Sequence, residues 1–231
     1  MNILILILAR KNSKRVPNKN IMRLGGKELI QWTIDSALEI SSLNKILVST
    51  DDAAIQEIAI KRNVLCPWLR PSQLSTDTAS SVEATIHAID WYEHNIEKLD
   101  GVLLLQPTSP FRCTQTLNEG ISLFKKNSRQ SVVGVSKCTQ HPELCLVEKK
   151  GNLFAYRDGN KFNLRTQDLE DAYYLNGSFY LSSPESIKKN RTFIPNGSIP
   201  LLSKKFYESI DIDTKDDFLI ADLIATHYHD F

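Results

Sequence analysis

Aliphatic residues fill the start of the chain without interruption and then give way to a polar, basic segment. Residues 3–8 are all Ile or Leu. A strand covered by helices on both faces is apolar at successive positions, whereas a half-exposed strand alternates between apolar and polar positions. The pattern therefore predicts a central strand of a parallel sheet, followed by a loop over residues 9–20.

Apolar positions then switch repeatedly between helical and strand-like spacing. The helices predicted in this way are 27–40, 52–62, 80–94 and 114–126. The strands predicted between them are 45–50, 101–106 and 130–136. This alternation predicts an α/β fold, with an open, mostly parallel, twisted sheet and helices on both of its faces.

Between residues 139 and 172 the pattern changes to short polar runs that Gly and Asn interrupt, with strand-like segments at 145–148 and 153–156. We interpret 139–172 as a small arm inserted into a single domain that spans residues 1–231. The parallel pattern is expected to return at 173–182. A last strand end is then expected to run into a final helix.

Composition narrows the class of protein. With 28 basic and 27 acidic residues the formal net charge is only +1, which argues against a nucleic-acid-binding protein. No apolar run approaches the roughly 18 residues of a membrane helix. Four cysteines without CxxC spacing predict buried thiols: Cys66, Cys113, Cys138 and Cys145. We expect a soluble, cytoplasmic protein that binds neither nucleic acid nor membrane.

The loop after the first strand is cationic and contains no glycine. Ligands of open α/β sheets bind beyond the carboxyl ends of the strands, so this position indicates an anionic ligand. The loop contains neither the G-x-G-x-x-G motif of dinucleotide-binding folds nor the G-x-x-x-x-G-K-[ST] motif of the P-loop, in which backbone amides bind phosphate. Side chains must therefore supply the donors here. The candidates for binding a triphosphate are Arg10, Lys14 and Lys19, with Ser13 and Asn20 as neutral donors. A solvated loop and a nucleic-acid patch are the alternatives.

The segment SIDIDT near the end of the chain carries two carboxylates. In an extended segment Asp211 and Asp213 share one face, and Ile210 and Ile212 turn into the core. Paired oxygen ligands suit Mg²⁺ that also binds phosphate. The alternative is a cap on the final helix, formed by Asp213 or Thr214 with Asp216 and Asp217 nearby.

The segment LLLQPTSPFR, residues 103–112, is a buried strand followed by polar residues and two prolines. It places Gln106, Thr108 and Ser109 at the carboxyl edge of the sheet. A rigid turn without a ligand is the alternative interpretation.

Six segments occur in an order typical of one family. They are AR-x-x-SK-x-x-P-x-KN, VSTDD, LRPSQLSTDTASS, LLQPTSPFR, NGSFYL and DIDT. Over nearly the whole chain this order resembles the CMP-sialic acid synthetases, or acylneuraminate cytidylyltransferases. The resemblance implies a Rossmann-like nucleotidyltransferase that converts CTP and a nine-carbon 2-keto-3-deoxy sugar acid to a CMP-sugar and pyrophosphate, with Mg²⁺ as cofactor.

The resemblance also implies roles for individual residues. The nucleotide-binding residues it implies are Arg10, Asn12, Ser13, Lys14, Lys19, Asn20, Arg70 and Ser81. The sugar-binding residues are Gln106, Asn176, Tyr180 and Phe193, of which Phe193 resembles a residue contributed by a neighbouring subunit. Asp211 and Asp213 match the metal-binding pair, and the implied catalytic residues are Arg10, Lys14, Lys19, Asp211 and Asp213. The arm at 139–172 resembles a dimerisation element, so a homodimer is expected.

Two departures from the family pattern concern the ligands. Lys11-Asn12 stands where Gly-Gly is common, so side chains are expected to replace some amide contacts to phosphate. Relatives that use N-acetylneuraminate carry a Lys and an Arg near positions where this chain has Leu144 and Leu175, with Tyr174 beside the latter. A less polar pocket predicts a legionaminic- or pseudaminic-type sugar acid. The alternatives are a CMP-Kdo synthetase and a non-catalytic nucleotide- or RNA-binding module.

Overall fold

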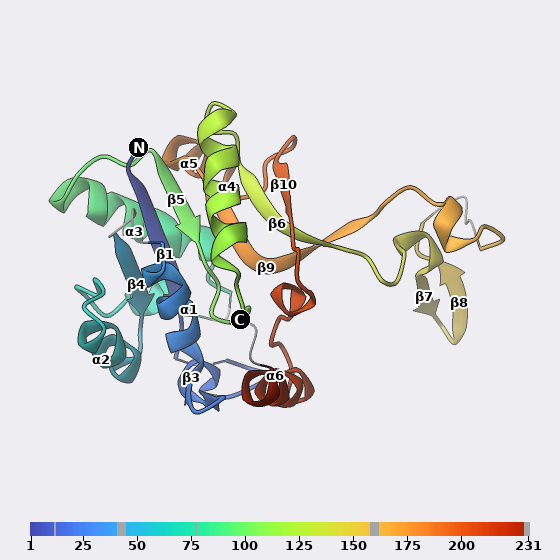
Figure 1. Ribbon diagram of the computed structural model, residues 1–231, viewed down its shortest axis with the longest axis horizontal. Coiled ribbons are helices and arrows are strands. Elements are labelled where there is room, and N and C mark those ends of the chain that lie inside the picture. The colour runs from blue at the N-terminus through green and yellow to red at the C-terminus, as the bar shows by residue number, and fades with distance from the viewer. Residues whose placement is uncertain (12, 41–44, 77, 158–161, 229–231) are drawn as a thin grey trace.

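A mixed β-sheet forms the centre of the protein (Figure 1). The computed structural model describes residues 1–11, 13–40, 45–76, 78–157 and 162–228. Within these residues the sheet has the strand order β10-β6-β9-β5-β1-β4. Its strands are β1 (Ile3–Ala9), β4 (Ile46–Thr50), β5 (Gly101–Leu104), β6 (Val132–Lys137), β9 (Tyr173–Ser182) and β10 (Ile199–Leu202).

Most neighbouring strands of this sheet are parallel. β1 pairs in parallel with β4 and β5, and β10 pairs in parallel with β6. This confirms the predicted open, mostly parallel sheet. The expectation that 173–182 would resume the parallel pattern is wrong, because β9 runs antiparallel to both β5 and β6. The chain leaves β6 into the arm and returns from it in β9, so the two strands form the legs of one long hairpin.

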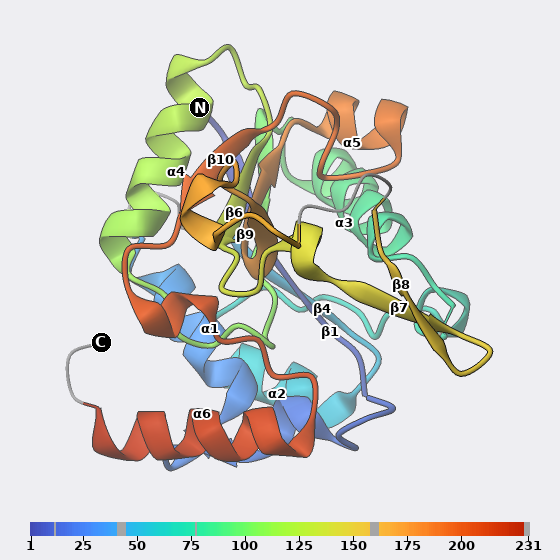
Figure 2. The ribbon, with the colours of Figure 1, turned by 90° about the vertical axis from the view of Figure 1, so that its right-hand side faces the viewer.

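Helices cover both faces of the sheet, as Figure 2 shows. One face packs against α1 (Leu29–Leu38), α2 (Ala53–Lys61) and α4 (Thr114–Lys126). The other packs against α3 (Ser81–Asn95) and α5 (Pro184–Asn190). Ile3, Ile5 and Ile7 of β1 join the first core cluster, whereas Leu4 and Leu6 join the second. Burial on both faces explains why β1 is apolar at successive positions.

A third core cluster lies beside the sheet. The short strands β2 (Arg23–Leu24) and β3 (Lys27–Glu28) pair around Gly25 and Gly26, so α1 begins at Leu29 rather than at the expected residue 27. Their hairpin packs near α6 (Lys215–His227). Phe111, Tyr207 and Ile212 fill the space between these elements. This cluster fixes the segment that carries Asp211 and Asp213.

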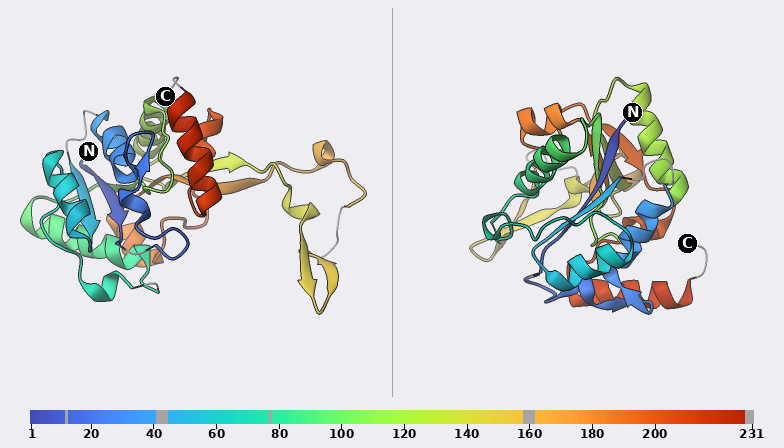
Figure 3. Two further views of the ribbon diagram at one scale, coloured as in Figure 1. Left: turned by 90° about the horizontal axis from the view of Figure 1, so that it is seen from below. Right: turned by 90° about the vertical axis from the view of Figure 1, so that its left-hand side faces the viewer.

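A narrow arm leaves the body between β6 and β9 (Figures 1 and 3). Its described part contains the hairpin of β7 (Leu146–Lys149) and β8 (Asn152–Ala155), which turns at Lys150 and Gly151, both with positive φ. Apolar side chains of the arm are exposed in the single chain, among them Leu153, Phe154 and Tyr156.

The four cysteines differ in their exposure. All four cysteines have free thiols, but only Cys66 is buried, and Cys145 is exposed, so the prediction of buried thiols is wrong for the other three. Cys145 directly precedes the thin β7–β8 hairpin, which has no core of its own that could bury the thiol. None of the helices in the described ranges is long and apolar enough to cross a membrane.

Candidate active site

A pocket of about 580 Å³ opens at the carboxyl ends of β1 and β5. From β1 the chain crosses to β4 on one side, whereas β5 lies on the other side of β1. Loops at such a switch point leave the sheet in opposite directions and create the crevice where open α/β sheets bind ligands. The pocket therefore lies where the sequence predicts a ligand site.

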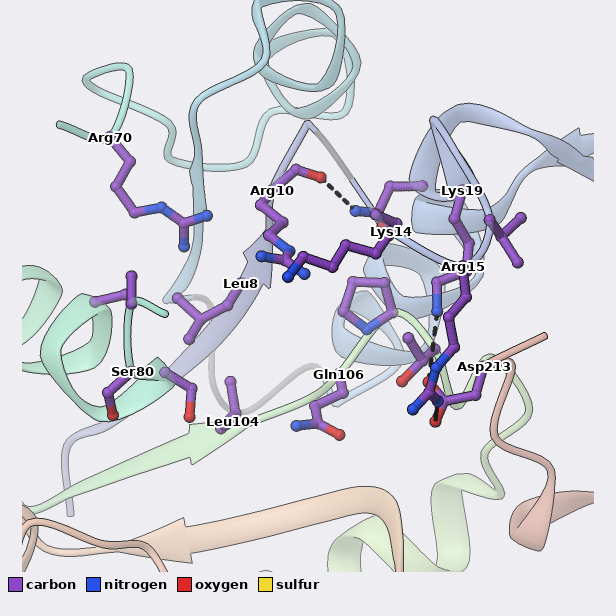
Figure 4. Close-up of a pocket in the computed structure, with 18 of the residues that line it drawn as sticks. Leu8, Arg10, Lys14, Arg15, Lys19, Arg70, Ser80, Leu104, Gln106 and Asp213 are labelled. Atoms are coloured by element: carbon purple, nitrogen blue, oxygen red, sulfur yellow. Dashed lines mark hydrogen bonds and ion pairs between the residues drawn. The ribbon is translucent and has the colours of Figure 1, made fainter. Parts of the chain in front are cut away.

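Most of the residues proposed from the sequence line this one pocket (Figure 4). Those that the structure brings together are Arg10, Ser13, Lys14, Lys19, Asn20, Arg70, Ser81, Gln106, Asp211 and Asp213. Asn12 lies outside the described residues. Cations, carboxylates and neutral donors from distant parts of the chain thus share one cavity.

The basic loop is held by its own side chains. The Asn20 amide donates to the carbonyl of Arg10 at 3.0 Å and so joins the two ends of the loop. The buried Lys19 ammonium donates to the carbonyl of Ile212. Burial lowers the pKa of Lys19, and the carboxylates of Asp213 and Asp211 oppose this shift. Lys19 therefore links the basic loop directly to the segment that carries Asp211 and Asp213.

The two carboxylates face the same pocket. Ile212 is completely buried between them, and its amide donates to the carbonyl of Thr108 at 2.8 Å. This confirms the predicted alternation of the extended segment. Burial among the pocket walls raises the pKa of Asp211; a hydrogen bond from Thr108 opposes this rise, and nearby Asp213 adds to it.

The final helix is capped without the Asp213 side chain. Thr214 is the N-cap of α6, and its hydroxyl accepts a hydrogen bond from Asp217 N at 3.1 Å. The Asp217 carboxylate accepts in return from Thr214 N at 2.7 Å. This capping box satisfies the helix terminus. The Asp213 carboxylate instead receives Arg15 Nη1 at 2.7 Å. Helix capping therefore explains the roles of Thr214 and Asp217, whereas the side chains of Asp211 and Asp213 line the pocket.

Arg70 and Ser80 mark the opposite end of the pocket from Asp213 (Figure 4). The buried Arg70 side chain donates to Ser75 Oγ at 3.1 Å and lies 3.8 Å from the Asp51 carboxylate. Its burial lowers its pKa, and Asp51 opposes this effect. Arg10 and Lys14 lie between the two ends (Figure 4). The pocket is therefore elongated, with a cationic end at Arg70 and an acidic end at Asp213.

A close approach of three segments forms the wall beside Asp211. Gly177 has a φ of 75°, and a Cβ atom there would meet Ser109 Oγ, lie 3.0 Å from Gln106 Oε1 and lie 3.6 Å from Asp211 Oδ1. The register of β6 and β9 shifts at this point, as in a β-bulge beside an active site. Only glycine both adopts this conformation and leaves this space open.

Arg112 connects segments of this wall through hydrogen bonds. Its buried guanidinium donates to Gln106 O at 2.6 Å, to Ser178 O at 2.9 Å and to Thr33 Oγ1 at 3.1 Å. Burial lowers the pKa of Arg112 to about 9, and the charge of Asp211 opposes this shift. A buried positive charge thus lies close enough to Asp211 to interact with it.

Three residues assigned to a sugar site are absent from the lining of this pocket. The buried Asn176 amide donates to Ser136 Oγ at 3.0 Å, and its oxygen accepts from Ser178 N and Oγ. Tyr180 and Phe193 are buried with ring centroids 6.2 Å apart. The Phe193 ring belongs to the core of its own chain, so a contact with a neighbouring subunit would require it to leave that core.

A family comparison decides the class of protein. The model of the cytidylyltransferase family matches residues 4–212. The chain belongs to the cytidylyltransferases.

Curated relatives of this cytidylyltransferase act on sugar acids according to their names. The chain is 38% identical over 229 residues to the CMP-N,N'-diacetyllegionaminic acid synthase of Legionella pneumophila, covering 96% of this chain and 95% of the relative. It is 29% identical to the pseudaminic acid cytidylyltransferase of Campylobacter jejuni, covering 100% and 99%. It is also 33% identical to an N-acylneuraminate cytidylyltransferase of Streptococcus agalactiae, covering 95% of this chain and 52% of that longer relative.

Solved structures show the same fold at lower sequence identity. CMP:2-keto-3-deoxy-manno-octonic acid synthetase in complex with CTP superposes with a TM-score of 0.69 at 13% identity, covering 97% of this chain and 98% of the other. At this identity the likeness supports the Rossmann-like nucleotidyltransferase fold alone.

Sequence reasoning assigned no role to two arginines at this site, one that lines the pocket and one that lies behind its wall. Arg15 lines the pocket and pairs with Asp213. Arg112 was part of a quoted motif but received no role, because its contacts come from residues far away in the sequence. Its position within the predicted LLLQPTSPFR segment was the only available signal.

Proposed function

We propose that this cytidylyltransferase transfers CMP from CTP to a nine-carbon 2-keto-3-deoxy sugar acid of the legionaminic type and releases pyrophosphate. The observation that carries the proposal is the shared pocket, in which the basic loop faces Asp211 and Asp213. The likeness to the Legionella pneumophila synthase over 96% of the chain supports this choice of reaction.

The polar ends of the pocket suggest how CTP would lie. The nucleoside would occupy the end formed by Arg70 and Ser80, and the triphosphate would lie along Arg10 and Lys14 toward the acidic end. The anomeric hydroxyl of the sugar acid would attack the α-phosphorus while the bond to pyrophosphate breaks. Arg10, Lys14 and Lys19 would offset the charge that develops on the leaving group. Catalysis would then consist mainly of positioning and charge neutralisation.

The acidic end fits a magnesium site. Asp211 and Asp213 supply hard oxygen ligands, and no group of three or more His, Cys, Asp or Glu side chains suited to a metal occurs in the described part of the chain. Mg²⁺ suits such an incomplete set, because it commonly combines one or two carboxylates with substrate phosphates and water. When bound, Mg²⁺ would supply positive charge to the phosphate oxygens. Asp211 and Asp213 would hold it, and Thr108 would orient Asp211.

The choice of sugar rests on the missing cations and on the relatives. By the resemblance, Leu144 and Leu175 stand near the positions where relatives that use N-acetylneuraminate carry Lys and Arg, and a less polar site favours a less hydroxylated acid. A Kdo substrate is supported only by a fold likeness at 13% identity. A non-catalytic RNA-binding role has less support, because the net charge is +1 and the carboxylates would repel a phosphate backbone.

We also propose that the enzyme is a homodimer joined through its arm. The arm exposes Leu153, Phe154 and Tyr156, and a thin hairpin of this kind cannot bury them by itself. A second copy would cover them. A cytoplasmic location, where CTP is made, follows from the proposed substrate.

Steady-state kinetics on one preparation test the sugar. The measurement is kcat/KM with CTP for N,N'-diacetyllegionaminate, pseudaminate, N-acetylneuraminate and Kdo, with the CMP-sugar identified by mass spectrometry. We expect the legionaminate to be preferred, with some activity on close analogues, because one lost contact costs only about 1–3 kcal/mol. A tenfold preference for N-acetylneuraminate, which requires about 1.4 kcal/mol, would contradict the assignment.

A further inference from the structure

Arg15 lies in the pocket but directs its charge at a carboxylate (Figure 4). Its Nη1 atom lies 2.7 Å from Asp213 Oδ2, and the two side chains are 68% and 56% exposed. The side chain can therefore turn without disturbing the core. An exposed ion pair of this kind is weak and is readily exchanged for another partner.

The two carboxylates of the acidic end have different surroundings. Asp213 faces Arg15 through Oδ2, and its Oδ1 lies 4.0 Å from the Lys19 ammonium. Asp211 instead accepts a hydrogen bond from Ser109 Oγ at 3.5 Å, and the Thr108 side chain opposes the rise in the pKa of Asp211. Of the two, Asp213 is therefore the carboxylate whose oxygens already face cations.

A guanidinium and a divalent cation compete for the same carboxylate. Both are positively charged, and Arg15 occupies the Oδ2 atom that a metal ion would approach. Phosphate is a strong alternative partner for arginine, because the planar guanidinium can donate two parallel hydrogen bonds to it. Since Arg15 lines the same pocket as Arg10 and Lys14, nucleotide phosphates in that pocket would lie within its reach.

We propose that Arg15 is the counter-ion of Asp213 in the ligand-free enzyme and moves to the phosphates of CTP, so that Asp213 accepts Mg²⁺ only together with the nucleotide. This inference rests on the proposed magnesium site and adds an order to its assembly. Coupling between ligands is reciprocal, so Mg²⁺ strengthens CTP binding by the same factor by which CTP strengthens Mg²⁺ binding. The enzyme would thus remain largely free of metal until its nucleotide arrives.

The test is metal binding without any turnover. Mn²⁺ serves as the probe, and its free concentration is followed by electron paramagnetic resonance during titration of nucleotide-free enzyme. We expect Arg15→Gln to bind Mn²⁺ several-fold more tightly than the wild type, because the exposed ion pair that the metal must displace is weak. Arg15→Lys, which keeps a charge but loses the planar fork, should fall between the two.

Two controls make this result specific. Arg23→Gln removes the same charge from an exposed position of β2 outside the pocket lining and should leave Mn²⁺ binding unchanged. In the Asp213→Asn background, Arg15→Gln should no longer strengthen Mn²⁺ binding, because the shared carboxylate is gone. A second readout is CTP affinity in EDTA, which Arg15→Gln should weaken several-fold.

Different results would contradict the role of Arg15 and the magnesium site itself. If wild-type enzyme binds Mn²⁺ in the presence of CTP at a site that Asp213→Asn removes, but Arg15→Gln leaves metal binding without CTP unchanged or weaker, the inference about Arg15 is wrong and the magnesium site stands. If wild-type enzyme binds no Mn²⁺ with or without CTP, the proposed metal site is wrong and the role of Arg15 falls with it.

Discussion

The carbonyl oxygen of Thr108 accepts a hydrogen bond from Ile212 N at 2.8 Å. Thr108 follows β5, whereas Ile212 separates the two carboxylates after β10. The side chain of Thr108 also lowers the pKa of Asp211, opposing the effect of burial. One residue of the segment Pro107-Thr108-Ser109 therefore holds the backbone of the acidic segment and favours the ionised form of one of its carboxylates.

Thr108→Val should raise the pKa of Asp211 further. The backbone hydrogen bond to Ile212 remains, but the hydroxyl that stabilises the ionised carboxylate is lost. The measurement is a carbon-13 NMR titration of the Asp211 carboxyl in metal-free protein. Thr226→Val, on the exposed side of α6, serves as the control and should leave this titration unchanged. A titration of Asp211 at an equal or lower pH in Thr108→Val would contradict the assigned contact.

Asp211→Asn should abolish most turnover without weakening the fold. Its folded-state pKa is raised, so the ionised side chain opposes folding once the pH exceeds the pKa of the unfolded chain. At pH 7 the free energy of unfolding of Asp211→Asn should equal or exceed that of the wild type in EDTA. This gain should disappear below the ordinary pKa of Asp, where the carboxyl is protonated in both states. Asp213→Asn should also lose turnover. Near-normal rates in both variants at saturating Mg²⁺ would overturn the metal-ligand role.

Arg112→Met should destabilise the protein by about 3 kcal/mol. The change leaves the acceptors on Gln106, Ser178 and Thr33 without their buried donor. Arg112→Lys keeps a charge but cannot donate in three directions with the same planar geometry, so it should recover only part of the loss. Chemical denaturation measures both variants. A loss below about 0.5 kcal/mol in Arg112→Met, typical of a surface substitution, would show that these contacts contribute little.

Charged substitutions on the arm should separate the proposed dimer. Leu153→Asp combined with Phe154→Asp places charges on exposed apolar positions of β8 and should give monomers in light scattering. The matched control is Leu223→Asp, which changes an exposed apolar residue of α6 in the body. If the wild type is already monomeric at assay concentration and fully active, the proposed assembly is wrong.

The sequence predicted the structure best where the burial of a side chain depends only on its position along one short extended segment. The unbroken Ile and Leu residues of β1 predicted a strand covered on both faces, and the core clusters confirm it. The alternation in SIDIDT likewise predicted that Asp211 and Asp213 would share a pocket. In both cases side-chain direction follows from the backbone period alone.

Features set by distant segments could not be predicted in this way. The antiparallel direction of β9 depends on the arm returning beside β6, which periodicity does not encode. The short elements α5 and β10 were not predicted; α5 has seven residues and β10 has four, too few for a clear period. The Asn176 side chain forms its hydrogen bonds with Ser136 and Ser178, and Arg15 pairs with a carboxylate 198 positions away. Such contacts exist only once the sheet has formed.

Phosphorus-31 NMR tests the central claim most directly. The enzyme is incubated with Mg²⁺, N,N'-diacetyllegionaminate and either CTP or UTP, and the phosphorus products are followed over time. With CTP we expect equal amounts of pyrophosphate and one new phosphodiester, the CMP-sugar. UTP should react slower by orders of magnitude, because polar groups matched to cytosine would be left unpaired by uracil. CTP that stays unchanged, or that yields CDP or free CMP without a sugar phosphodiester, would contradict cytidylyl transfer to a sugar acid.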